Sequence, residues 1–81
     1  MKVRLLFFAV LRDITGHSST ELTLAAGTTA RQVWEQLRGE HARLAVWTQP
    51  PMTAVNEEYT SADVELRDGD ELAFIPPVAG G

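Results

Sequence analysis

The clearest candidate for chemistry in this sequence is the carboxylate of the glycine pair Gly80-Gly81. Residues without a Cβ can enter a narrow channel and accept almost any φ and ψ. The preceding Pro76-Pro77 lacks backbone N–H groups, so strand pairing is expected to end at Pro76. The six residues 76–81 therefore predict an extended arm with a reach of about 20 Å. Such an arm would present its terminal carboxylate to another protein.

A carboxylate does not react with sulfur or amine nucleophiles until one of its oxygens becomes a good leaving group. Acyl-adenylate formation with ATP achieves this. The sequence has no phosphate-binding glycine loop, so we expect a partner protein to bind the ATP. Because the sequence also has no cysteine, it cannot carry sulfur on a side-chain thiol. Any sulfur that it carries would form a thiocarboxylate at Gly81.

The other reactive residues lack the spacing of a known site. His17 and His41 have no partners at metal or general-base spacing, so we interpret them as surface or structural residues. The serines have no nucleophile elbow. The acidic residues between 63 and 71 match no calcium loop, and Asp68-Gly69-Asp70 is typical of a tight turn. The sequence predicts neither a metal site nor an enzyme that acts alone.

Length and composition indicate one small globular domain. The 81 residues are 44% hydrophobic, which suffices for a single core. A formal charge of −4, with scattered basic residues, argues against a nucleic-acid partner. The longest apolar run, Leu5 to Leu11, is too short to span a membrane, and no signal-peptide cleavage site follows it. We therefore expect a cytoplasmic protein without a membrane partner.

Two strands are expected at the amino-terminal end. Residues 2–10 predict a central strand because apolar residues occupy both alternating faces. One face carries Val3, Leu5 and Phe7, and the other carries Arg4, Leu6 and Phe8. A connection over residues 11–18, with Gly16 at positive φ, leads to a second strand over 21–25. This strand turns Leu22 and Leu24 toward the core, and the pair should form an antiparallel hairpin.

A helix is expected to follow Thr29, which forms a capping box with Gln32. Its apolar stripe consists of Ala30, Val33, Trp34 and Leu37. Gly39 has the position of a C′ residue that would end the helix. The alternative is a longer helix, because Leu44 continues the same stripe.

The second half of the chain is less regular. Residues 40–51 have no clear pattern, although Leu44, Val46 and Trp47 are expected to pack against the domain, and the tryptophans are interpreted as core residues. A third strand is expected over 52–56, followed by irregular chain with a brief turn over 57–67. The last strand is expected over 71–75, after the turn at Gly69.

The order β-β-α-β-β predicts an α+β fold of the β-grasp (ubiquitin-like) class. Its mixed sheet of four to five strands would be covered on one face by one main helix, and a later strand would pair in parallel with the first. The expected division is a domain over 1–75 and a tail over 76–81. Because Leu72 and Phe74 would face the core, Phe8 and Ile75 would form an exposed patch that is typical of a docking surface.

The sequence resembles the small subunits of molybdopterin synthase over essentially its whole length. The resemblance rests on residues 68–81, residues 6–9 (Leu-Phe-Phe-Ala), the helix start at Thr29 and residues 54–56 (Ala-Val-Asn). The ending Phe-Ile-Pro-Pro-Val-Ala-Gly-Gly is its most specific part.

This resemblance implies a β-grasp sulfur carrier that donates sulfur without being the catalyst. An E1-like, ATP-dependent activating enzyme would adenylate Gly81, and a sulfurtransferase or cysteine desulfurase would supply sulfur for the thiocarboxylate. The tail would then insert into the large synthase subunit, within a heterotetramer, to build the dithiolene of molybdopterin from cyclic pyranopterin monophosphate. Gly80 would be the steric companion of Gly81. The implied partner-binding residues are Phe8, Tyr59, Ile75, Pro76, Pro77 and Val78.

Two alternatives remain open. Related carriers that end in Gly-Gly serve the thiolation of thiamine thiazole or of tRNA, and some are conjugated to protein lysines. A different class would be a passive interaction domain whose tail does no chemistry.

Overall fold

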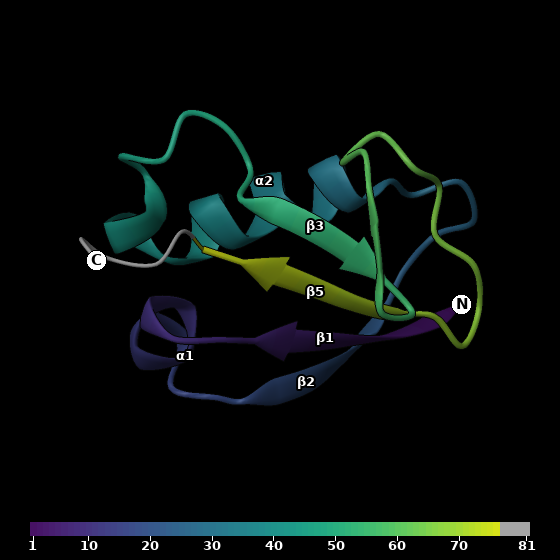
Figure 1. Ribbon diagram of the computed structural model, residues 1–81, viewed down its shortest axis with the longest axis horizontal. Helices are drawn as coiled ribbons and strands as arrows, with labels where there is room; N and C mark the ends of the chain where they lie inside the picture. Colours follow the sequence, from purple (N-terminus) through teal and green to yellow (C-terminus); the bar gives the residue numbers. More distant parts are fainter. Residues whose placement is uncertain (77–81) are drawn as a thin grey trace.

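The computed structural model describes residues 1–76. The predictions for Pro77, Val78, Gly80 and Gly81 lie outside the described residues. Figure 1 shows the described elements in chain order: β1 (Lys2–Phe7), α1 (Val10–Thr15), β2 (Ser19–Thr23), α2 (Ala30–Glu40), the 3-10 helix η1 (Ala42–Leu44), β3 (Met52–Val55), β4 (Glu58–Thr60) and β5 (Glu71–Ile75).

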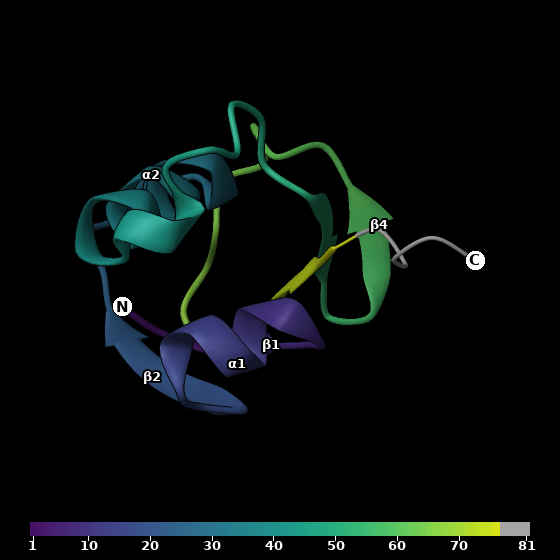
Figure 2. The same ribbon diagram turned by 90° about the vertical axis from the view of Figure 1, so that its left-hand side faces the viewer.

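The strands form one mixed sheet in the order β2-β1-β5-β3-β4; Figure 1 labels the first four of these strands, and Figure 2 labels β4. Strand β1 pairs antiparallel with β2 and parallel with β5. Strand β3 pairs antiparallel with β5 and with β4. The predicted hairpin and the predicted parallel pairing of the first and last strands are therefore confirmed, and so is the β-grasp fold.

Helix α2 covers one face of the sheet. In Figure 2 the helix lies at the left, and the edge strand β4 lies at the right. The predicted helical stripe of Ala30, Val33, Trp34 and Leu37 is buried, and Trp34 is 0% exposed. The ring of Trp34 lies 5.2 Å from that of Phe74 and 5.7 Å from that of Trp47, measured between centroids. Both tryptophans thus belong to the core or pack against it, as predicted.

The capping box at the start of α2 is confirmed. The Thr29 hydroxyl accepts a hydrogen bond from the backbone N–H of Gln32 at 3.2 Å, and the Gln32 side chain accepts one from the Thr29 N–H at 2.9 Å. The prediction that Gly39 ends the helix is wrong. The helix runs through Glu40 and His41 is its C-cap, donating its N–H to the Leu37 carbonyl at 2.9 Å. Leu44 then fills the core from the separate turn η1.

Strand β1 is shorter than predicted. It ends at Phe7 because Ala9 adopts a φ of 49°, outside the range of a strand. The expected loop over 11–18 contains the helix α1 instead, which places Leu11 in the core. Gly16 has the predicted positive φ, at 79°, where it ends α1. The second strand lies two residues earlier than predicted, because Ser19 pairs with Leu6.

Two further corrections concern the second half of the chain. Val46 does not pack against the domain and is 80% exposed, whereas Leu44 is buried and Trp47 is half-buried. Residues 58–60, predicted to be irregular, form the edge strand β4. A three-residue strand with two exposed positions carries no readable alternation, so its partner β3 decides its conformation. The bounds of β5 agree with the prediction.

Candidate functional site

The last described residues leave the middle of the sheet. Strand β5 lies between β1 and β3, and its last register pair joins Ile75 to Met52. Pairing stops before Pro76, as predicted from its missing N–H. Pro76 itself is buried. The chain therefore reaches residue 76 at the end of a central strand, one residue after Ile75. The division into a domain and a tail stays a prediction.

A single row of residues crosses four strands on the face opposite α2. In the strand register, Leu6 lies beside Ala73, Ala73 beside Ala54, and Ala54 beside Tyr59. The two central positions carry methyl groups, whereas the outer positions carry large side chains. Small residues between large ones leave a hollow in the surface of the sheet.

Larger side chains surround this hollow. Phe8, which is 44% exposed, and Ile75 complete it at the end where β1 and β5 finish, and Tyr59, which is 69% exposed, rises from the edge strand. The hollow has a volume of about 230 Å³. We call it the open-face groove and define its apolar part as Leu6, Phe8, Ala54, Tyr59, Ala73 and Ile75.

The structure thus brings Phe8, Tyr59 and Ile75 to one hollow, although they come from three separate parts of the chain. Phe8 is not part of the sheet. It lies between Phe7, the last residue of β1, and Ala9, which has a positive φ. Exposed apolar area in a concave surface is typical of a binding site. The role of these three residues in partner binding stays a prediction.

Two carboxylates, Glu57 and Glu71, also line the open-face groove. Arg4 lies beside Glu71 in the register of β1 and β5. The ion pairs within residues 1–76 lie elsewhere and join Lys2 to Glu21, Arg31 to Asp63, and Arg38 to Glu35. The groove therefore combines an apolar floor with negative charge at its margin.

The shortest of those ion pairs belongs to the other side of the sheet. Arg31 Nε donates to Asp63 Oδ1 at 2.7 Å. This hydrogen bond and the attraction of the guanidinium lower the pKa of the Asp63 carboxyl, and the same contact raises the pKa of Arg31. The backbone N–H of Arg31 also donates to the Ala62 carbonyl at 2.7 Å. The ion pair therefore fastens the start of α2 to the loop before β5.

The two histidines lie near each other without forming a metal site. His17 and His41 line a separate hollow of about 240 Å³, together with Glu40, two threonines and three apolar residues. Within residues 1–76, no group of three histidine, aspartate or glutamate side chains has an arrangement that could hold a metal ion. In the same part of the chain, no helix is both long and apolar enough to cross a membrane.

Reasoning from the sequence missed the floor of the groove and its acidic margin. Alternation along residues 71–75 would have placed Glu71, Ala73 and Ile75 on one face. Ala54 and Glu57 could not be added, because their positions depend on how β3 pairs with β5 and β4. The sequence did contain one signal, the alanines Ala54 and Ala73 within strands of otherwise larger residues. Such small side chains leave a hollow in the surface of a sheet.

The fold and the open face define the class of ubiquitin-like β-grasp proteins. Residues 5–81 match the ThiS family. The chain is 37% identical over 81 residues to the molybdopterin synthase sulfur carrier subunit of Escherichia coli (strain K12), covering 98% of this chain and 99% of that protein.

Two solved structures from Haloferax volcanii have the same fold. The HVO 2177 protein is 28% identical with a TM-score of 0.86, covering all of this chain and 87% of that chain. SAMP1, a small archaeal modifier protein, is 25% identical with a TM-score of 0.79, covering all of both chains. The chain belongs to the ThiS family of sulfur carriers, and its resemblance to molybdopterin synthase small subunits is confirmed.

Proposed function

We propose that this chain is the sulfur-carrying small subunit of a molybdopterin synthase, loaded with sulfur at the carboxyl group of Gly81. The relatives that match the whole chain carry this function in their names, and the family match extends to residue 81. The structural observation that supports the proposal is the position of β5. Its last residue, Ile75, lines the open-face groove, so a partner bound there lies within one residue of Pro76, where the tail begins.

The proposed chemistry has two steps before delivery. The Gly81 carboxylate attacks the α-phosphorus of ATP and releases pyrophosphate, which leaves an acyl-adenylate with AMP as the leaving group. A donor that supplies sulfur at the oxidation level of sulfide then displaces AMP and leaves a thiocarboxylate. Gly80 contributes by its lack of a side chain, since a narrow channel in a partner admits it.

Other proteins carry out the catalysis in this proposal. An E1-like activating enzyme binds the ATP. A sulfurtransferase or cysteine desulfurase provides the sulfur as a persulfide, and a thiol reductant supplies the two electrons that bring it to the level of sulfide. The large synthase subunit binds Phe8, Tyr59 and Ile75, with Pro76, Pro77 and Val78 leading the tail into its active site. There the sulfur enters cyclic pyranopterin monophosphate as part of the dithiolene. We place this function in the cytoplasm, where ATP is available.

Intact-mass spectrometry tests the loading step. The chain is incubated with its cognate activating enzyme, ATP and a sulfur donor, and the mass should change by the replacement of one oxygen with sulfur. Deletion of Gly81 should abolish both this change and sulfur transfer. The deletion should leave the fold intact, because the core cluster of the described chain lies between Val3 and Phe74. Full transfer activity in the deletion variant would defeat the assignment.

The fold similarity to SAMP1 favours one further candidate, a protein modifier. A modifier would use the same activated carboxyl group but transfer it to a lysine amine. Mass spectrometry of proteins that co-purify with the tagged chain separates the two functions. A large synthase subunit supports the carrier, whereas isopeptide-linked adducts support the modifier. Partners that act on thiazole or tRNA would assign the carrier to another thiolation pathway.

A further inference from the structure

The turn between β3 and β4 has an unusual backbone. Val55 pairs with Glu58, so Asn56 and Glu57 form a two-residue hairpin loop. Both have positive φ, at 51° for Asn56 and 70° for Glu57, which is the signature of a type I′ turn. Asparagine is favoured at the first of these positions and glycine at the second. Glutamate at the second position is strained.

The contacts of Asn56 explain its own conformation. Its side chain donates to Asp70 Oδ1 at 3.0 Å and accepts from the backbone N–H of Glu71 at 3.0 Å. Its backbone N–H donates to the Glu71 carbonyl at 2.8 Å. These bonds hold the turn against the start of β5. They therefore fix the position of Glu57 although its backbone is strained.

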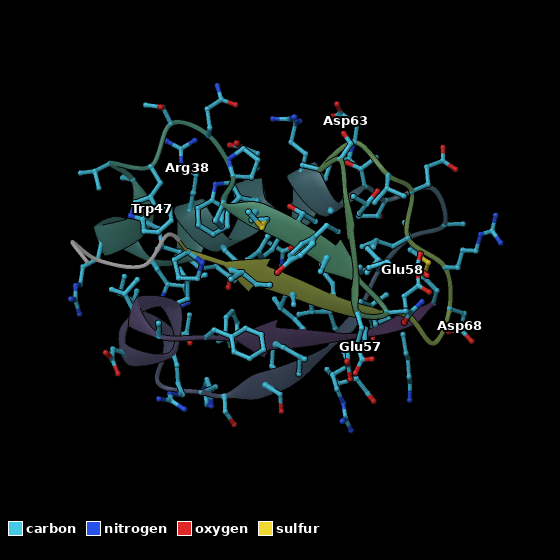
Figure 3. All side chains as sticks on the ribbon, in the orientation of Figure 1. Arg38, Trp47, Glu57, Glu58, Asp63 and Asp68 are labelled. Carbon is cyan, nitrogen blue, oxygen red and sulfur yellow. The ribbon has the colours of Figure 1, made fainter. Side chains whose placement is uncertain are left out.

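The position of Glu57 indicates what the strained residue does. Glu57 lines the open-face groove together with Ala54, Tyr59 and Glu71, and Figure 3 labels it at the end of the hairpin that β3 and β4 form. Arg4 is the cationic neighbour of Glu71 across β1 and β5. Glu57 lies at the end of the β3–β4 hairpin, and no ion pair of residues 1–76 includes it. A strained residue that makes no stabilising ion pair within its own fold points to a role with a partner.

We propose that Glu57 is a specificity-determining residue that receives a basic side chain of the large synthase subunit. An apolar side chain of that subunit fills the hollow over Ala54 and Ala73, and a neighbouring arginine or lysine pairs with the Glu57 carboxylate. Docking removes water from the groove, which strengthens the pairing of opposite charges. This inference rests on the proposed function and adds the chemistry of the partner surface.

Calorimetry with the cognate large subunit tests the pairing, with Glu58→Gln as the matched control. Glu58 belongs to the same turn but lines a different hollow, with Glu65 and Arg67. Glu57→Gln should weaken binding about tenfold and flatten its salt dependence. Glu58→Gln should change the affinity less than about twofold. Equal affinities of wild type and Glu57→Gln, or an equal loss in both variants, would overturn the inference.

Thermal unfolding of the free chain supplies a second readout. Glu57→Gly relieves the backbone strain and should raise Tm by about 4–8 °C, while it weakens binding as much as Glu57→Gln. A residue with a merely structural role would not raise Tm and lower affinity together. An unchanged or lower Tm in Glu57→Gly would contradict the strain and overturn this reading of the turn.

Two outcomes separate this inference from the proposed function. If wild type binds the large subunit and transfers sulfur but Glu57→Gln does so equally well, only the inference fails. If wild type does not bind the large subunit, the proposed function fails and the inference with it. Sedimentation of the free chain tests whether a second copy of this chain occupies the groove instead. A dimer of wild type that Glu57→Gln dissolves would assign the groove to a second copy and overturn the inference.

Discussion

The two faces of the sheet are built by the same strands but differ in how they fill space. On the face beneath α2, Leu5, Leu72 and Phe74 are 0% exposed and pack tightly around Trp34. On the opposite face, their neighbours in sequence include Leu6 and Ala73, which border a hollow. We expect this alternation along a strand to separate stability from partner binding, so single substitutions should affect one without the other.

The largest expected effect is a difference in stability between substitutions at two adjacent residues of β5, Phe74 and Ile75. Phe74→Ala removes a core ring that packs against Trp34 and should lower the free energy of unfolding by about 3–5 kcal/mol. Ile75→Ala, one residue later on the open face, should lower it by about 1 kcal/mol. Urea denaturation of both variants measures the difference.

The same two variants should show the opposite order in binding. Under conditions in which both are folded, Ile75→Ala should weaken binding to the large subunit more than Phe74→Ala does. Similar losses of stability in the two variants would mean that the open face contributes to the core, and the comparison of the two faces would be wrong.

Phe8→Arg should have the next largest effect, on affinity alone. A charge placed in the apolar rim must be desolvated on docking, so binding should weaken by about 10- to 100-fold. The free energy of unfolding should change by less than about 0.5 kcal/mol, because Phe8 lies outside the strands and is already 44% exposed. Calorimetry measures the affinity, and an unchanged value would remove Phe8 from the partner-binding surface. Val46→Arg is the matched control, since Val46 is exposed and does not line the groove.

The smallest expected effect is a pH dependence of the free energy of unfolding, caused by the Arg31–Asp63 ion pair on the side of the sheet that α2 covers. The contact with Arg31 lowers the pKa of Asp63 in the folded state. Its stabilising contribution is therefore complete above the unfolded-state pKa of about 4 and is lost as the pH falls through the lower folded-state value. Asp63→Asn should remove this part of the acid-induced loss of stability, measured by urea denaturation between about pH 2 and 6.

Arg31→Gln provides the control for that measurement. It removes the other partner of the same ion pair, so it should reduce the pH dependence as Asp63→Asn does, and the double variant should show no further reduction. Because the pair is exposed, neither variant should change affinity for the large subunit. A change in affinity would mean that this ion pair belongs to a partner-binding surface.

The helix and the last strand could be predicted because local chemistry decides them. The capping box at Thr29 and the spacing of Val33, Trp34 and Leu37 leave few alternatives to a helix packed on a sheet. The boundaries that were missed depend on contacts between distant residues. Leu11 of α1 is buried in the core, and β4 pairs with β3 at the edge of the sheet that residues 1–76 form.

The candidate site divides in the same way. Phe8 and Ile75 could be assigned to the open face from alternation alone, and the glycine pair from its resemblance to sulfur carriers. The alanine floor and the glutamate at the end of the groove could not, since Ala54 and Glu57 come from a hairpin whose register the sequence does not state.

The sequence by itself determined which side chains of β1, α2 and β5 face the core, because this depends on the order and type of neighbouring residues. It also predicts the chemistry of the carboxyl end. Only the tertiary structure decided that Leu6, Ala73, Ala54 and Tyr59 form one row with Glu57 at its end. The physical reason is strand register. Backbone hydrogen bonds between strands distant in sequence set it, and a shift of one residue would exchange the two faces.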